Sequence, residues 1–303
     1  MITPTFAEFI KPTSPADFLT SYRGRSPLYI PGSPSRYESL PKIQDLNKMF
    51  LSFKSFPGVF RMSRPQGPIP LDKILFPIPN SSRGFIKTQA VEQYLQAGAT
   101  LVLESCESYL EGAQAMSAML SKALLARVHA GLFLVYEPEQ PCGVHWDNYD
   151  MFICQLAGSK KWPLYRPVYQ NPIFARERKG GKRQDLELVD ELTLRAGDGL
   201  YVPRGWPHNP AATEGPSMHI SFAMATPTGA DLLEWIRDDL SETSPEFRAD
   251  LPLLLTTDTK LQFAARLREL ILERLSLDSI EQYCKSYKST LLPQPLELPE
   301  LRE

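Results

Sequence analysis

The sequence has few cysteines, few histidines and no long apolar run. The four cysteines, Cys106, Cys142, Cys154 and Cys284, are scattered and form no CxxC pair, which is typical of reduced thiols in a cytoplasmic protein. Apolar runs such as 132–136 are about five residues long, well short of the roughly 20 that a membrane helix needs. The first residues, MITPTFAEF, contain neither a basic nor an apolar segment, so no secretory signal is expected. We therefore expect a cytoplasmic protein without a membrane segment.

The chain also lacks an excess of charge of either sign. It has 33 Lys and Arg against 35 Asp and Glu, a net charge of -2. A protein built to bind phosphate backbones needs a basic excess, so direct nucleic-acid binding is not expected. The proportions of hydrophobic (43%) and charged (22%) residues are those of an ordinary globular protein. The 303 residues could form one large domain or a catalytic domain with an appendage.

The pattern of turns and apolar residues changes along the chain. A helix is expected to begin at Pro15 with Ser14 as its N-cap, and the Pro- and Ser-rich residues 55–85 are expected to be a long loop. From Leu132 onward, short apolar stretches alternate with Gly, Pro and Asp, which predicts the closely spaced strands of a jelly roll or barrel. Apolar residues then recur at helical spacing. We predict a mainly β fold with flanking N-terminal helices and a C-terminal helical segment, divided into residues 1–98, 99–228 and 229–303.

Two stretches, GVHWDNYDMF and GDGLYVPRGWPHNP, carry the most specific signal. We expect a strand to begin at His145, and on such an extended segment His145 and Asp147 point to the same face because they are two residues apart. With His208, which follows a later strand, they would form the two-histidine, one-carboxylate ligand set of non-haem Fe(II) oxygenases. The alternative is that both histidines are satisfied core or turn residues. Because the chain has only four histidines, their place in these contexts favours the metal site.

Lys160 follows His145 by fifteen residues, in the stretch AGSKKW. A lysine that points into a barrel needs a counter-charge, because a buried ammonium without one is costly. A dicarboxylate lying in the barrel would supply that charge. The alternative is that Lys160 and Lys161 both belong to a solvated hairpin. On a strand, however, neighbouring side chains point to opposite faces, so one of the pair can be buried while the other is wet.

The stretch HWDNYDMFICQLAGSKKWPLYRP, which begins at His145, resembles the JmjC-type, cupin-like oxygenases that depend on Fe(II) and 2-oxoglutarate. It is most similar to their ribosomal oxygenase subgroup, which has H-x-D, a strand, then Q-x-x-G-x-K/R-x-W and Y-R-P, and the spacing matches without a gap. The stretch GDGLYVPRGWPH is similar to the strand and turn that bear the second metal histidine. The resemblance covers most of the chain, from DFLTSYRGRSPLYIPG to about residue 250, and implies a double-stranded β-helix of the jelly-roll, cupin type.

The resemblance also implies roles for individual residues. His145, Asp147 and His208 would bind Fe(II), and Lys160 would pair with the distal carboxylate of 2-oxoglutarate, with O2 as the oxidant. The positions of His219 and Ser221 line the co-substrate pocket in the family. For His219, a hydrogen-bonded core histidine is an equally good interpretation.

Two departures from the family pattern stand out. Gly131 occupies the position, fourteen residues before the first metal histidine, where the family often has Asn, which puts one polar co-substrate contact in question. The subgroup usually ends in a winged-helix domain, whereas only 95 residues follow His208, enough for the dimerisation helices alone. A different or smaller substrate is therefore conceivable.

The expected function is hydroxylation of an amino-acid side chain in a protein or peptide, by a homodimer. Tyr136, Tyr201 and Arg204 stand near the metal-bearing segments in sequence and are candidates for the substrate pocket, although core packing explains each tyrosine equally well. Three alternatives stay open: the same chemistry on a free amino acid or a natural-product precursor peptide, a metal-dependent isomerase or other non-oxygenase of the cupin fold, and a non-catalytic binding module.

Overall fold

The structure is a computed structural model that describes residues 3–52, 54–55, 59–80, 84–137, 143–173 and 186–291. The chain divides into two compact units, Met1–Ala225 and Thr226–Glu303. The described cysteines, Cys106, Cys154 and Cys284, are free thiols, and Cys142 lies outside the described residues.

The described residues of the first unit form a large sheet, a small second sheet of three strands, and helices around them. Its helices are α1 (Phe6–Phe9), α2 (Pro15–Asp17), α3 (Ile43–Ser52), α4 (Leu71–Ile74), α5 (Thr88–Gln96) and α6 (Glu111–Leu124). Its N-terminal strands are β1 (Leu28–Ile30), β2 (Lys54–Ser55), β3 (Phe60–Arg64), β4 (Gly67–Pro68), β5 (Leu75–Pro77), β6 (Gly84–Ile86) and β7 (Thr100–Leu103). Its later strands are β8 (Arg127–Val135), β9 (Asp150–Tyr165), β10 (Leu188–Arg195), β11 (Gly199–Val202) and β12 (Ala211–Ala225).

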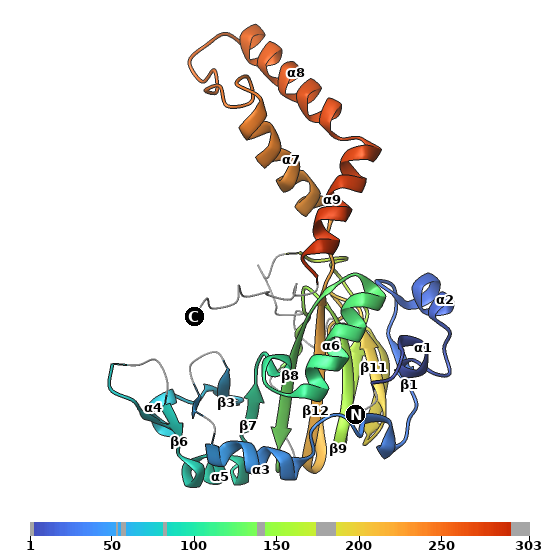
Figure 1. Ribbon diagram of the computed structural model, residues 1–303, viewed down its shortest axis with the longest axis vertical. Helices are drawn as coiled ribbons and strands as arrows, with labels where there is room; N and C mark the ends of the chain where they lie inside the picture. Colours follow the sequence, from blue (N-terminus) through green and yellow to red (C-terminus); the bar gives the residue numbers. More distant parts are fainter. Residues whose placement is uncertain are drawn as a thin grey trace, which may run out of the picture. The chain divides into compact units, whose positions relative to one another are not determined.

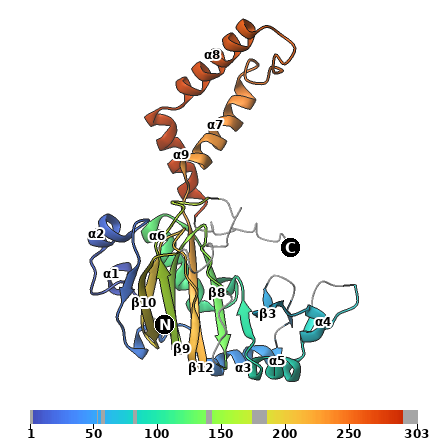
Figure 2. The same cartoon turned by 180° about the vertical axis from the view of Figure 1, so that it is seen from behind.

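Nine antiparallel strands form the main sheet, in the order β1-β11-β9-β12-β8-β7-β3-β4, with β10 paired to β9. The long strand β9 pairs with β12 along one edge, while β11 and β10 share its other edge. Figure 2 shows β10, β9, β12 and β8 side by side. Two short strands thus continue one another along a long one, as in a curled double-stranded β-helix. The predicted jelly-roll, cupin-type fold with flanking helices is confirmed.

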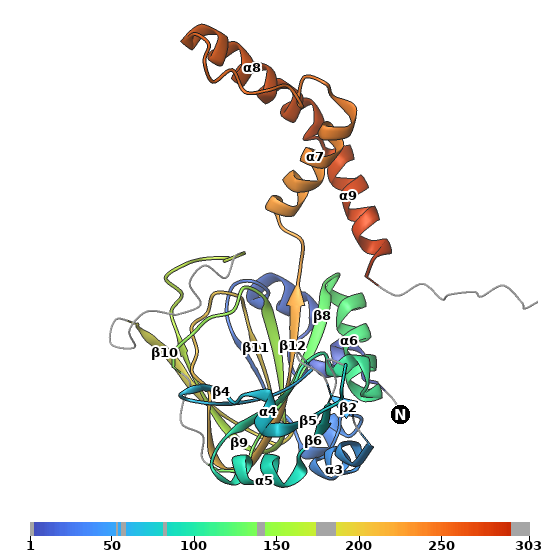
Figure 3. The same ribbon diagram turned by 90° about the vertical axis from the view of Figure 1, so that its left-hand side faces the viewer.

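The two faces of the main sheet have different roles. On one face, alternate residues such as Leu132 of β8 and Ile220 of β12 are fully buried in a core shared with Phe9 of α1 and Met116 of α6. Figures 1 and 3 show α6 lying along β8 on this side of the sheet. The opposite face of the same strands lines a cavity. The period-two alternation of strands therefore separates a dry core from a polar site.

Strand β9 changes the phase of its alternation part-way along. In its first half the inward residues are odd-numbered, Met151 and Ile153, and in its second half they are even-numbered, Trp162 and Leu164. Gly158 lies between the halves with a φ of +62°, opposite a register irregularity in β12. A Cβ on this glycine would lie 2.2 Å from the carbonyl oxygen of Pro216, so only glycine fits here.

Some predicted elements are confirmed and others are wrong. Ser14 caps α2, which begins at Pro15 as predicted. Residues 55–85 are not one long loop, because β3, β4, α4 and β5 lie within them. The strand expected to begin at His145 begins only at Asp150.

The described residues of the second unit form the helices α7 (Gly229–Thr243), α8 (Thr257–Arg274) and α9 (Leu277–Ser289). Its core of buried residues is small and contains Ile236, Leu240 and Leu270. An ion pair of 2.6 Å between Arg274 and Asp239 joins α8 to α7. Among the helices of the described residues, none is both long and apolar enough to span a membrane.

Candidate active site

The segment that bears His145 is held against the segment that bears His208 by backbone hydrogen bonds. The amide of His145 donates to the carbonyl of His208 at 3.0 Å, and the amide of His208 donates to the carbonyl of His145 at 2.8 Å. The amide of Gly205 donates to the carbonyl of Asp147 at 2.8 Å. The residues that were expected to begin a long strand thus form an isolated bridge instead. Because the segment is still extended, His145 and Asp147 point to one side.

Asp150 fixes the turn that leads to His208, a role that the sequence did not reveal. Its carboxylate accepts hydrogen bonds from the Tyr201 hydroxyl at 2.7 Å and from the Arg204 amide at 2.9 Å. The strand β11 and the following turn are therefore tied to the start of β9. The one available signal was the second acidic residue of DNYD, three positions after Asp147.

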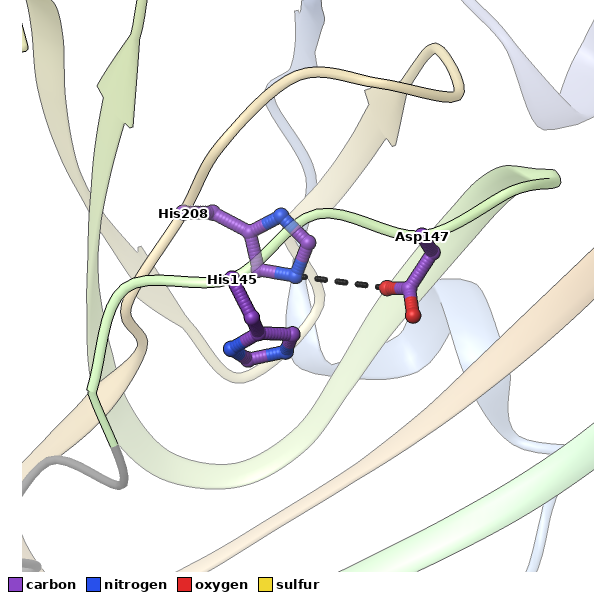
Figure 4. Close-up of side chains that lie close together, drawn as sticks. All are labelled: His145, Asp147 and His208. Carbon is purple, nitrogen blue, oxygen red and sulfur yellow. Dashed lines mark ion pairs between the residues drawn. The ribbon is translucent and has the colours of Figure 1, made fainter. Parts of the chain in front are cut away.

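Ligand atoms of His145, Asp147 and His208 lie within 4.8 Å of one another (Figure 4). The Nε2 atom of His208 lies 3.5 Å from Oδ2 of Asp147. Each histidine uses its other nitrogen on the backbone: Nδ1 of His145 lies 3.1 Å from the Gly143 carbonyl, and Nδ1 of His208 lies 2.9 Å from the Trp206 carbonyl. Because a carbonyl only accepts, both Nδ1 atoms carry the proton and both Nε2 atoms present a lone pair.

Burial keeps His208 neutral. Burial and, to a lesser extent, the neighbouring His145 lower the pKa of His208 from 6.5 to about 4, against the opposing effects of Asp147 and of the hydrogen bond to the Trp206 backbone. The close contact between His208 and Asp147 drawn in Figure 4 is therefore not a charge pair at neutral pH. A neutral imidazole beside a carboxylate is the protonation state that a divalent metal needs.

A cavity of about 710 Å³ contains the three side chains and also Lys160, His219 and Ser221. Lys160 is only 3% exposed, whereas its neighbour Lys161 forms a 2.7 Å ion pair with Glu191 at the surface. The structure thus places the buried member of the lysine pair in the same cavity as the triad. The solvated-hairpin alternative holds for Lys161 alone.

His219 forms part of an aromatic wall of this cavity. Its ring stacks on Phe133 with centroids 4.8 Å apart and an interplanar angle of 3°, and Trp162 meets it edge-on at 5.7 Å. Burial, together with the nearby Lys160 ammonium, holds the pKa of His219 well below its ordinary value of 6.5. His219 is therefore a neutral ring beside a buried cation.

Gly131 lies in the cavity wall, on β8. A Cβ at this position would lie 3.2 Å from Cε2 of Phe133 and 3.4 Å from Oε2 of Glu104. A larger side chain could therefore enter only if the Phe133 ring moved. Glycine has no side chain and phenylalanine carries no N–H or O–H group, so neither Gly131 nor Phe133 offers a side-chain hydrogen-bond donor on this strand.

The candidate substrate residues do not line the cavity in the described part of the chain. Tyr201 is fully buried in the core, where its ring contacts Phe18 and Phe152. Tyr136 is half-buried against the same core, and Arg204 contributes its backbone amide to Asp150. For Tyr201 the structure supports the packing interpretation. The cavity lining instead includes Trp162, Asn209 and Arg61, which the sequence did not identify as substrate residues.

Comparison with known proteins assigns the barrel. Residues 103–232, which include the triad, Lys160 and the strands that carry them, match the JmjC domain family.

Curated proteins to which this chain is similar include two insect proteins named bifunctional lysine-specific demethylase and histidyl-hydroxylase NO66. The protein of Drosophila willistoni is 27% identical over 229 residues, which are 67% of this chain and 30% of that protein. The protein of Aedes aegypti is 24% identical over 319 residues, which are 95% of this chain and 48% of that protein. The chain thus spans less than half the length of these relatives.

Solved structures with the same fold include YcfD of Escherichia coli. One structure has a TM-score of 0.59 at 18% identity, covering 95% of this chain and 76% of YcfD. Another, described as a ribosomal oxygenase in complex with cobalt and 2-oxoglutarate, has a TM-score of 0.55 at 18% identity, covering 90% and 70%. At this identity the likeness establishes a shared fold.

Proposed function

We propose that this chain is an Fe(II)- and 2-oxoglutarate-dependent oxygenase that hydroxylates an amino-acid side chain in a protein or peptide. The observation that carries the proposal is the shared cavity, in which His145, Asp147 and His208 converge and Lys160 is buried beside them. A metal-ligand set together with a buried cation suits a dicarboxylate that binds the metal at one end and the lysine at the other.

The donor set fits Fe(II). Two neutral imidazoles and one carboxylate are the ligands of the facial triad, which leaves the remaining metal positions open to other ligands. Nδ1 of each histidine is bonded to a backbone carbonyl, so the metal-facing nitrogen and the ring orientation are set before the metal arrives. When bound, Fe(II) supplies the activation of O2 that no side chain can perform.

The protein's own groups hold and orient the reactants. The Lys160 ammonium binds a carboxylate of the co-substrate by charge, in a cavity where burial strengthens that interaction. The Phe133, Trp162 and His219 rings wall the space beside it. Such aromatic walls exclude water from the site, which favours reaction with the substrate over unproductive side reactions.

The far end of the cavity supports a peptide substrate. There the lining reaches Arg61 of β3 and Glu104, whose side chains are 44% and 36% exposed and form a 2.7 Å ion pair. A substrate side chain can enter from this solvent-accessible end while its main chain stays outside. The names of the relatives, histidyl-hydroxylase and ribosomal oxygenase, agree with a protein substrate.

Mass spectrometry tests the proposal. The chain would be incubated with Fe(II), 2-oxoglutarate and O2, either with a library of peptides or with the corresponding free amino acids. We expect peptide products heavier by one oxygen atom and succinate formed in equal amount, with neither in the Asp147→Ala variant. Oxidation of free amino acids but not of peptides would favour the small-molecule alternative. Failure to form succinate with any substrate would favour a non-oxygenase or a binding module.

We further propose that the chain forms a homodimer through its second unit. That unit exposes many leucines, among them Leu251 at 63%, Leu253 at 73% and Leu254 at 99%. Large apolar side chains gathered on a small unit are typical of a protein interface. A cytoplasmic location is also part of this proposal, and the likeness to a bacterial ribosomal oxygenase supports it.

A further inference from the structure

The indole N–H of Trp162 is a buried hydrogen-bond donor with no partner among the described residues. The side chain is only 2% exposed. Buried polar groups in proteins are nearly always hydrogen-bonded, because an unpaired one loses its bonds to water without replacement. An unpaired indole N–H therefore indicates that its hydrogen-bond acceptor is a bound ligand rather than a residue of the chain.

The position of Trp162 indicates where that partner lies. Trp162 lines the cavity and follows Lys160 by two residues on β9, so both side chains point inward. Its ring lies 5.8 Å from the His208 ring and 5.7 Å from the His219 ring, measured between centroids. The indole thus flanks the stretch of cavity between a metal ligand and the wall beside Lys160.

A second buried polar atom in the same cavity has no partner among the described residues. It is Oδ1 of Asn209, the residue directly after His208. On the facing strand β8, by contrast, Gly131 and Phe133 offer no side-chain donor. On β9, Lys160 and Trp162 both present side-chain N–H donors to this cavity.

We propose that the indole N–H of Trp162 donates a hydrogen bond to a carboxylate oxygen of 2-oxoglutarate. This inference rests on the function proposed above. A dicarboxylate that extends from the metal ligands to Lys160 passes the indole, and all of its oxygens can accept a hydrogen bond. Trp162 is then a co-substrate-binding residue, and it compensates for the lack of a side-chain donor at Gly131.

Nuclear magnetic resonance gives a direct test. The chain has four tryptophans, so a ¹⁵N-labelled sample with Zn(II) has four indole N–H signals, which single Trp→Phe variants assign. Zn(II) is redox-inactive and accepts the same ligands, so no turnover intervenes. When 2-oxoglutarate is added, we expect the Trp162 proton signal to move downfield as a new hydrogen bond forms. An unmoved Trp162 signal at saturating 2-oxoglutarate would refute the inference.

Binding affinity gives a second test with a matched control. Trp162→Phe keeps an aromatic ring at this position and removes the N–H donor. It should raise the Kd for 2-oxoglutarate about tenfold or more, measured by calorimetry with Zn(II). Tyr165→Phe is the control, because the Tyr165 hydroxyl is also buried, lacks a partner among the described residues and lies on the same strand, but outside the cavity lining. If removing an unpaired polar atom affects only stability, both variants will bind 2-oxoglutarate as the parent does.

The outcomes separate this inference from the proposed function. A parent chain that does not bind 2-oxoglutarate in the presence of Zn(II) would contradict the function itself. A parent that binds, with an unchanged Kd in Trp162→Phe and an unmoved indole signal, would leave the function intact and assign the indole N–H to water.

Discussion

The two units of the chain use their apolar side chains in opposite ways. In the first unit most large apolar residues are inside, Phe152 and Tyr201 among them, and the sheet has a core on one face and a polar cavity on the other. Among the described residues of the second unit, the buried core consists of Ile236, Leu240 and Leu270, while Leu254 is 99% exposed. The first unit buries polar groups for chemistry, and the second exposes apolar groups that suit association.

This difference indicates what each unit is suited to bind. A buried lysine and two buried histidines are costly to desolvate, so a fold that keeps Lys160, His208 and His219 inside indicates a ligand that uses them. Exposed leucines cost little in a monomer, yet they favour contact with another apolar surface. Substitutions in the two units should therefore affect different properties.

The largest effect is expected at the triad. His208→Ala should lower turnover by at least about a thousandfold, because it removes a metal ligand from the interior of the first unit. Metal content, measured by atomic absorption after gel filtration, should fall with it. Leu254→Asp in the second unit should keep both the metal and turnover. Full activity in His208→Ala would mean that the metal, if any, binds elsewhere.

Lys160 and Lys161 allow a buried and an exposed lysine to be compared on one strand. Lys160→Ala should raise the KM for 2-oxoglutarate on the order of 10- to 100-fold, because it removes a charged hydrogen-bond partner. Lys161→Ala should change that KM less than about twofold, because the Lys161 side chain is 44% exposed and its ammonium is paired with Glu191. Equal effects from the two substitutions would contradict the assignment.

The sequence predicted that one lysine of this pair is buried, but it could not decide which by alternation alone. Counting from Met151 and Ile153, strict alternation places Lys161 inside. The irregularity at Gly158, with its φ of +62°, shifts the phase so that Lys160 is inside. The resemblance to the family named Lys160 correctly as the buried member, because the spacing in that motif already includes the irregularity.

The convergence of the candidate metal ligands was predictable for a related reason. His145, Asp147 and His208 form a pattern of residue types and spacing that chemistry restricts strongly, and the structure brings their ligand atoms together. Tyr201 shows the limit of this approach. It lies close to the site in sequence, but its strand turns it toward the core, where it bonds to Asp150. Proximity along the chain does not determine the face on which a side chain lies.

Association through the second unit is the next largest expected effect. The pair of substitutions Leu253→Asp and Leu254→Asp should convert a dimer to a monomer at micromolar concentration, because each places a charge on an apolar surface that association would bury. Analytical ultracentrifugation would measure the mass. Val168→Asp, at a 74% exposed position of the first unit, is the control and should not change it. A parent chain that is already a monomer would contradict the dimer.

The smallest effect concerns pH and reports on the polar interior of the first unit. The pKa of His219 is lowered by burial, and that of His208 is lowered to about 4, whereas an unfolded histidine titrates near 6.5. Below pH 6.5 the unfolded chain therefore binds more protons than the folded one, and the free energy of unfolding must fall as the pH falls. Each buried histidine contributes up to about 1.4 kcal/mol per pH unit in that window, which for His208 ends near its folded pKa.

His219→Phe should reduce this dependence by up to one proton, measured as urea unfolding of the metal-free chain between pH 7.5 and 5. If His219→Phe and the parent lose stability equally on acidification, His219 is not held neutral in the folded chain.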